Sequence, residues 1–272
     1  MIIKKTRLYN YILSQKDNIN LHKQQGFSYE KYKIEPLISI PEYKSCLNRL
    51  SKPLITRDFI ISCFKNASFN NYEAFVYSMI WGGINHTRPS VSGDKTSTHF
   101  YMSLEFGRDN INNVIQSVND FLDNDNLGEA FDSMLTGNNK IPGVGISYFT
   151  KILFFLGQKS SINIKPLIYD KWTKAIHILY LFENNENQKL YNFYTQNSIN
   201  KLIKNHDLIQ TRKNQEKAAY LDYVNIMNNL SDICEIEDVG NLESFLFGYP
   251  KNNNYKNNPR LKILSLLENY KK

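Results

Sequence analysis

The stretch of sequence that decides the fold reads IPGVGISYFTKILFFLG and covers residues 141–157. It begins with a turn in which Gly143 and Gly145 flank one valine, and it continues as an apolar helix. An earlier helix is expected over residues 127–135, which makes a helix-hairpin-helix unit of about residues 128–157. Glycines let a backbone come close to a nucleic-acid phosphate, and the next helix directs free N–H groups at it. The pattern predicts a grip on that backbone, independent of base sequence; a plain helix corner with glycine caps is the alternative.

The chain after the hairpin helix reads PLIYDKWTKAI at residues 166–176. Asp170 stands where a new amphipathic helix is expected to begin, in a segment of residues 166–178. A carboxylate at a helix N-terminus accepts backbone N–H groups and lies at the positive end of the helix dipole. Asp170 is therefore a helix cap alone, or a cap that also serves catalysis, and its place directly after the hairpin favours the second interpretation.

This order of features resembles the helix-hairpin-helix DNA glycosylase superfamily and, within it, the bacterial 8-oxoguanine DNA glycosylase (OGG)-like proteins. The likeness rests on the hairpin, on Asp170, on Phe149-Thr150-Lys151 with Phe154-Phe155, and on residues 220–224 and 242–247. It is fullest over residues 128–178, extends to residue 248 and is faint before Thr56. The resemblance implies an all-α glycosylase fold, with two helical lobes around a DNA-facing cleft. A target nucleotide would be flipped from the duplex into this cleft.

The resemblance also implies the catalytic residues. Asp170 matches the aspartate that stabilises the oxocarbenium-like sugar or positions the attacking water. Family members that form a Schiff base carry a lysine two residues after the Gly-x-Gly turn, where this chain has Ser147. Lys151 follows one helical turn later on the same face. It could act as an amine nucleophile, or it could instead contact a phosphate or the Asp170 carboxylate. We therefore expect a monofunctional hydrolase, with Lys151 as the candidate for any strand-nicking activity.

Further candidates surround these two segments. The expected DNA-binding residues are Lys140, Gly143, Gly145, Ser147, Lys171 and Lys174, although solvated lysines are common on any protein surface. The candidates for the base pocket are Trp81, His86 and Arg88, with a place in the core as the alternative for the tryptophan. No metal or cofactor is expected, apart from a monovalent cation at the hairpin that the family likeness makes possible.

Composition agrees with a basic, well-packed protein. The 272 residues carry 33 Lys and Arg against 26 Asp and Glu, a formal charge of +7 that suits a polyanionic partner. Hydrophobic residues make up 42% of the chain, enough for a sizeable core. The three cysteines, Cys46, Cys63 and Cys234, are far apart, and the histidines show no HExxH pattern, so a metal centre is not expected. We find no signal-peptide core and no membrane-spanning run, and we expect a cytoplasmic monomer.

The pattern along the chain divides it in two. Residues 1–55 are expected to form an N-terminal arm packed on the core, and residues 56–272 the glycosylase-like domain. Helices are expected over residues 108–122, 127–135, 172–182, 188–204, 215–230 and 242–247, whereas residues 98–104 could be extended.

These inferences leave several functions open. The partner would be duplex DNA with a modified base, either oxidised guanine or a glucosylated or otherwise hypermodified cytosine of phage DNA, removed as antiphage defence. The rival from another class is a non-catalytic DNA-binding helix-hairpin-helix module, in which Asp170 only caps its helix. A helical domain that binds RNA or protein is a third possibility.

Overall fold

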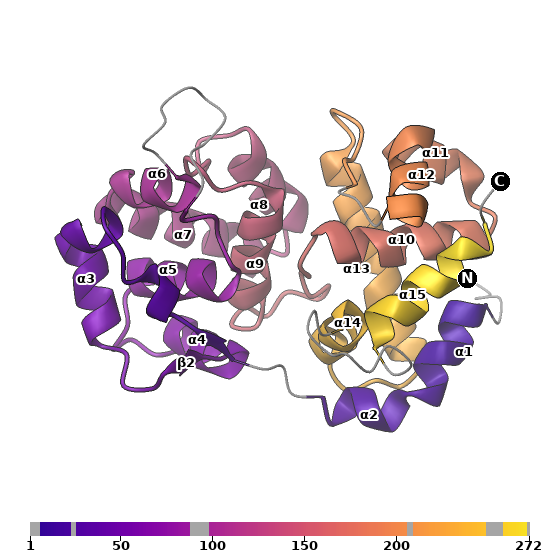
Figure 1. Ribbon diagram of the computed structural model, residues 1–272, viewed down its shortest axis with the longest axis horizontal. Coiled ribbons are helices and arrows are strands. Elements are labelled where there is room, and N and C mark those ends of the chain that lie inside the picture. Colours follow the sequence, from indigo (N-terminus) through magenta and orange to yellow (C-terminus); the bar gives the residue numbers. More distant parts are fainter. Residues whose placement is uncertain (1–5, 23–25, 88–97, 206–208, 249–257, 271–272) are drawn as a thin grey trace. The chain divides into compact units, whose positions relative to one another are not determined.

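The protein is almost entirely helical. The computed structural model describes residues 6–22, 26–87, 98–205, 209–248 and 258–270, and these contain fifteen α-helices (Figure 1). The only sheet among the described residues is an antiparallel pair in which Phe27 lies opposite Ile55 and Ser28 opposite Leu54. The expected all-α fold is confirmed.

The chain forms two compact units. Unit 1 contains residues 1–23 and 167–272, and unit 2 contains residues 24–166. The expected arm of residues 1–55 is thus shared between the two units. The reason lies in packing, because α1 (Arg7–Ser14) and α2 (Lys16–Asn20) contact C-terminal helices, whereas α3 (Pro41–Asn48) packs on α5 (Asn71–Trp81).

Unit 2 is built around α9 (Ile146–Gly157), which packs against four other helices of that unit. Every residue of α9 from Phe149 to Gly157 is buried, so this helix has no solvated face beyond its first turn. The elements around it are β1 (Phe27–Ser28), η1 (Glu30–Tyr32), η2 (Leu37–Ser39), α3, β2 (Leu54–Ile55), α4 (Arg57–Lys65), α5, α6 (His99–Glu105), α7 (Arg108–Asp123) and α8 (Leu127–Leu135).

Unit 1 is built in the same way around α10 (Lys171–Glu183). This helix is buried from Thr173 to Leu181 and contacts α1, α11, α13, α14 and α15. The remaining helices of the unit are α11 (Asn187–Phe193), α12 (Gln196–Asn205), α13 (Glu216–Ile233), α14 (Val239–Phe247) and α15 (Pro259–Glu268) (Figure 1).

Two expectations about local structure were wrong. Residues 98–104 are not extended, because Thr98 Oγ1 accepts a hydrogen bond from Tyr101 N at 3.2 Å and so caps α6. The single helix expected over residues 188–204 is divided into α11 and α12. Tyr194 between them is extended and pairs with Thr211 in an isolated β-bridge, which sequence periodicity alone does not indicate.

A chain of buried polar groups crosses unit 1. His177, which is fully buried, has Nε2 at 3.0 Å from Asp222 and Nδ1 at 2.8 Å from the Tyr194 hydroxyl. That hydroxyl lies 2.6 Å from the hydroxyl of Tyr169. Burial lowers the pKa of His177 and outweighs the hydrogen bond to Asp222. A neutral imidazole fits these partners, since Nε2–H can donate to the carboxylate while Nδ1 accepts from Tyr194.

The buried imidazole predicts a pH-dependent stability of unit 1. Because the pKa of His177 is lowered on folding, the unfolded chain binds more protons as the pH falls below about 6.5, and stability is lost. The loss should grow as the pH falls from about 6.5 towards the lowered pKa of the folded protein. The free energy of unfolding of unit 1 is measured as a function of pH by urea denaturation, with Trp172 fluorescence as the probe in a Trp81→Phe background.

His177→Gln is the control, because an amide can make both hydrogen bonds but does not titrate. The variant should be less stable at neutral pH, and its stability should change less between pH 7.5 and 5.5. Equal pH dependence in the two proteins would contradict the assignment of a neutral His177.

Candidate DNA-binding hairpin and catalytic aspartate

The hairpin loop between α8 and α9 is held from inside. The buried Asn139 donates hydrogen bonds from Nδ2 to Ser117 Oγ at 3.0 Å and to Ser133 Oγ at 3.1 Å. Ile141 and Val144, on either side of the first hairpin glycine, are both buried. The loop is therefore a rigid part of unit 2, with a defined backbone path into α9.

The two hairpin glycines have different roles. Gly143 has a φ of +75°, and a Cβ there would clash with the carbonyl oxygen of His99. Only glycine fits this position, because the neighbouring atom belongs to the backbone. Gly145 is exposed and extended, and a Cβ there would meet open space. Gly145 also leaves the N-terminus of α9 without a side-chain cap, so no side chain of the cap residue takes up the first N–H groups of this helix.

Lys151 lies one turn into α9, on the face that the spacing predicted. Its Nζ donates to the carbonyl oxygen of Ser147 at 2.6 Å and lies 5.0 Å from the ring centre of Tyr148. The lysine is buried, and its aliphatic chain passes against Gly82, the residue that ends α5. Ser147 is half-buried and Lys140 is exposed. Ser147 and Lys151 thus lie in the first two turns of α9, directly after the hairpin loop of unit 2.

Asp170 is the N-cap of α10, as the sequence predicted. Its Oδ1 accepts the backbone N–H of Trp172 at 2.8 Å and of Thr173 at 3.2 Å. In return, Thr173 Oγ1 accepts the N–H of Asp170 at 2.8 Å and completes a capping box. No hydrogen bond from a described residue reaches Oδ2 of this half-buried side chain. One carboxylate oxygen is committed to the helix, and the other remains available to a ligand.

The two lysines near Asp170 that were expected to bind DNA differ in their exposure to solvent. Lys171 is half-buried, with its Nζ 4.6 Å from the ring centre of Trp172. Lys174 is only 9% exposed, and its Nζ lies 3.4 Å from the carbonyl oxygen of Ile209. Burial lowers the pKa of Lys174, and the Asp170 carboxylate offsets only part of this effect. Lys174 is therefore a buried neighbour of Asp170 and not a solvated side chain.

Arg260, on α15, is a third cation at this site that sequence reasoning missed. It is 9% exposed, stands 4.1 Å over Trp172, and donates from Nε to the carbonyl oxygen of Phe247 at 2.8 Å. Burial lowers its pKa to about 10 against the attraction of Asp170. No sequence pattern connects Arg260 with Asp170, because the two are ninety positions apart and meet only through the packing of α15 on α10.

Two of the three base-pocket candidates lie in or beside the core of unit 2. Trp81 is 5% exposed and packs edge-on against Phe155, with ring centres 5.3 Å apart. It therefore lies in the core, which is the alternative that the sequence left open for this residue. His86 is half-buried against Tyr32, with ring centres 4.1 Å apart, and burial lowers its pKa. Arg88 lies outside the described residues. These three assignments stay predictions.

The structure groups the candidates in two sets. The hairpin residues, Lys151, Trp81 and His86 belong to unit 2, whereas Asp170, Lys171 and Lys174 belong to unit 1. In the part of the chain that the structure describes, no three His, Cys, Asp or Glu side chains gather as a metal site would require. None of the described helices has the length and apolar character needed to cross a membrane.

An all-α fold with a Gly-x-Gly hairpin, followed by an aspartate at the start of the next buried helix, defines the helix-hairpin-helix class of DNA glycosylases. The model of the family described as "Putative 8-oxoguanine DNA glycosylase OGG-like protein" matches residues 22–247, a span that includes the hairpin and Asp170. The chain belongs to this OGG-like family, which supports a DNA glycosylase in general, with DNA as its substrate. No curated protein and no solved structure matches the chain.

The two glycines provide a matched pair of substitutions. Gly143→Ala should destabilise unit 2 by more than about 2 kcal/mol, because it adds left-handed strain to a clash with the His99 backbone. Gly145→Ala should change stability by less than about 0.5 kcal/mol and yet weaken DNA binding, since its methyl group would stand where a phosphate approaches.

Urea unfolding followed by Trp81 fluorescence, in a Trp172→Phe background, measures stability in unit 2. Fluorescence anisotropy with a labelled duplex measures affinity. If Gly145→Ala bound DNA as tightly as the wild type, the hairpin would be a structural corner and not a phosphate grip.

Proposed function

We propose that this protein flips an altered nucleotide out of duplex DNA and hydrolyses its N-glycosidic bond, with Asp170 as the catalytic carboxylate. The hairpin would hold the DNA backbone, and no cofactor would take part in the reaction. A monovalent cation bound at the hairpin would serve only to hold a phosphate.

The observation that carries this proposal is that only one of the two carboxylate oxygens of Asp170 takes part in capping α10. Capping α10 uses one oxygen of the Asp170 carboxylate, so the second oxygen can contact a ligand. Here the capping box holds Oδ1 and so fixes the direction of Oδ2, for which no described residue is a partner. A charge that is already in place need not be reoriented at the moment of reaction, and this preorganisation is the main source of electrostatic catalysis. Lys174 and Arg260 attract the same carboxylate from buried positions and would help to keep it in place.

The reaction balances without a further reagent. The bond between C1′ and the base nitrogen breaks, and its electron pair leaves with the base, which takes up a proton. Positive charge develops on the sugar ring, and Oδ2 of Asp170 stabilises it at close range. A water oxygen then bonds to C1′ and loses its proton, which leaves an abasic site. Asp170 either accepts that proton or only orients the water.

Oxidised guanine is the first substrate to examine, because the description of the family names 8-oxoguanine. A glucosylated or hypermodified cytosine of phage DNA is the second, and its removal would make the protein part of antiphage defence. A sugar-bearing base needs a larger pocket with more polar partners, so these two substrates make different demands on the protein.

Water is proposed as the nucleophile instead of Lys151. The lysine is buried, and the hydrogen bond from its Nζ to the Ser147 carbonyl oxygen at 2.6 Å holds the amine beside its own helix, which makes it a poorly accessible nucleophile. Lys151 would then serve to hold the first turn of α9, next to the phosphate grip.

The decisive experiment is base release from duplexes that contain oxidised guanine, uracil, alkylated bases or glucosylated hydroxymethylcytosine. Asp170→Asn should reduce release of the substrate base by about 10² or more, because the negative charge is lost. The amide oxygen still caps α10, so Asp170→Asn should be more stable than Asp170→Ala, which also loses the cap at a cost of about 1 kcal/mol. Release is measured after alkali treatment, which cleaves at abasic sites.

Asp238→Asn is the matched control. Asp238 caps α14 of the same unit, where it accepts the N–H of Gly240 at 2.7 Å. This variant should release the base at the wild-type rate. If Asp170→Asn also kept full activity, Asp170 would be a cap alone. If no base were released while DNA binding stayed tight, a non-catalytic binding module would be the better description.

The choice of nucleophile has its own test. Wild-type protein incubated with substrate and sodium borohydride should form no covalent adduct with DNA, and strands should break only after alkali. Lys151→Gln should retain most of the base release, although its melting temperature is measured as a folding control. A borohydride-trapped adduct that disappears in Lys151→Gln would identify Lys151 as an amine nucleophile.

A further inference from the structure

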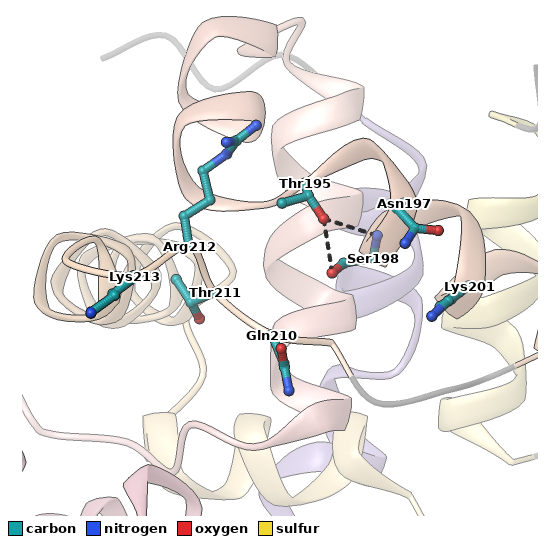
Figure 2. A pocket seen from close by; sticks show the side chains of 8 residues that line it. All are labelled: Thr195, Asn197, Ser198, Lys201, Gln210, Thr211, Arg212 and Lys213. Carbon is teal, nitrogen blue, oxygen red and sulfur yellow. Dashed lines mark hydrogen bonds between the residues drawn. The ribbon is translucent and has the colours of Figure 1, made fainter.

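A second polar site lies in unit 1, whereas the hairpin belongs to unit 2. It is a pocket of about 690 Å³ between the first half of α12 and the segment that precedes α13 (Figure 2). Eight residues line it: Thr195, Asn197, Ser198, Lys201, Gln210, Thr211, Arg212 and Lys213. Neither the proposed hairpin grip nor the proposed chemistry at Asp170 uses any of them.

The walls of this pocket are well ordered by their own hydrogen bonds. Thr195 Oγ1 accepts the N–H of Ser198 at 3.1 Å and donates to its Oγ at 3.0 Å, so it caps α12 (Figure 2). Across the pocket, Thr211 pairs with Tyr194 in the isolated bridge, and Arg212 N donates to the carbonyl oxygen of Phe193 at 2.8 Å. The bridge keeps the two walls at a fixed separation.

The lining points to a multiply charged anion. Lys201, Arg212 and Lys213 are exposed, and none of them forms an ion pair with a described residue. No acidic side chain lines the pocket, and the other lining groups are hydroxyls and amides. The start of α12 adds its positive dipole end. Guanidinium, ammonium and hydroxyl donors together are typical of phosphate recognition.

The same lining argues against a base or an apolar ligand. The pocket has no aromatic side chain on which a base could stack and no aliphatic floor. Its volume, and three cations spread along it, suit consecutive phosphates better than a single ion. A sugar-phosphate backbone has this spacing of charge, because each nucleotide contributes one phosphate.

Hydrogen bonds connect this pocket with Asp170. Tyr194, the neighbour of Thr195, and Tyr169, the neighbour of Asp170, have hydroxyl oxygens 2.6 Å apart, and both side chains are fully buried. Pocket and catalytic candidate therefore belong to one rigid part of unit 1. A strand gripped in the pocket would be held at a set distance from the Asp170 carboxylate.

We infer that the pocket formed by residues 195–201 and 210–213 binds consecutive backbone phosphates of the DNA strand that carries the target nucleotide. This inference rests on the proposed function, since it takes DNA as the ligand. The site adds to the hairpin and positions the strand from the side of unit 1.

The test compares two double variants that remove the same charge. Arg212→Gln with Lys213→Gln changes the pocket, and Lys44→Gln with Lys65→Gln changes exposed lysines of α3 and α4 in unit 2. The affinity of the full chain for a labelled duplex is measured from about 50 to about 200 mM salt. The pocket variant should bind about 10-fold more weakly, and the slope of log K against log salt should fall by about 2, because each lost phosphate contact contributes about 0.9.

The control variant should keep the wild-type affinity and slope, and both should melt at the wild-type temperature. Equal behaviour of the two double variants would overturn the inference. Calorimetry with inorganic pyrophosphate separates DNA from a free anion. If pyrophosphate bound at the pocket while DNA affinity did not depend on Arg212 and Lys213, the site would serve a small anion and the inference would be wrong.

The readouts distinguish this inference from the proposed function. The glycosylase proposal depends on base release by the wild-type chain, whereas the pocket depends on the difference in salt slope between variants. A chain that released no base could still show the pocket contact. An active glycosylase whose pocket variant kept its full salt slope would refute the pocket alone.

Discussion

The burial of two consecutive helices is the constraint on which the rest of this structure depends. After their first turns, α9 and α10 are enclosed by other helices of their own units, α9 from Phe149 and α10 from Thr173. A helix enclosed in this way can leave only its ends near solvent, and its first N–H groups still need partners. The N-terminus of α9 has no side-chain cap at its glycine turn, whereas the side chain of Asp170 provides these partners at the N-terminus of α10. The N-termini of α9 and α10 are thus the polar parts of two helices that are otherwise buried.

The same constraint explains why Asp170 can combine a structural with a chemical role. Its capping box with Thr173 positions the carboxylate before any ligand arrives, so a substrate would meet a preformed charge. The cations around it are unusual for the same reason. Lys174 and Arg260 are buried by the packing of α10 and α15, which lowers the pKa of both and leaves them attracted to Asp170. Removing the charge of Asp170 would therefore also remove a carboxylate that attracts these two buried cations.

Much of the architecture was predictable, since it depends on local patterns. The periodicity of residues 127–135 predicted α8, and the glycine turn with its apolar run predicted α9. Asp170 was recognisable as a helix start because a carboxylate there accepts the first N–H groups. Non-local contacts were not predictable. The break between α11 and α12 depends on a bridge to Thr211, and the inward course of Lys174 depends on Ile209, both distant in sequence.

The sequence by itself determined the helical class, the hairpin, the aspartate at the start of α10 and the family to which these belong. The helices, the hairpin and the aspartate follow from spacing within about twenty residues, where backbone geometry leaves few alternatives, and the family follows from the likeness of these segments to its members. Only the tertiary structure decided that residues 1–23 pack with the C-terminal helices, that Arg260 stands beside Asp170, and that eight residues from two segments enclose a basic pocket. Each of these depends on which apolar faces cover one another, and this is a property of the whole packed core.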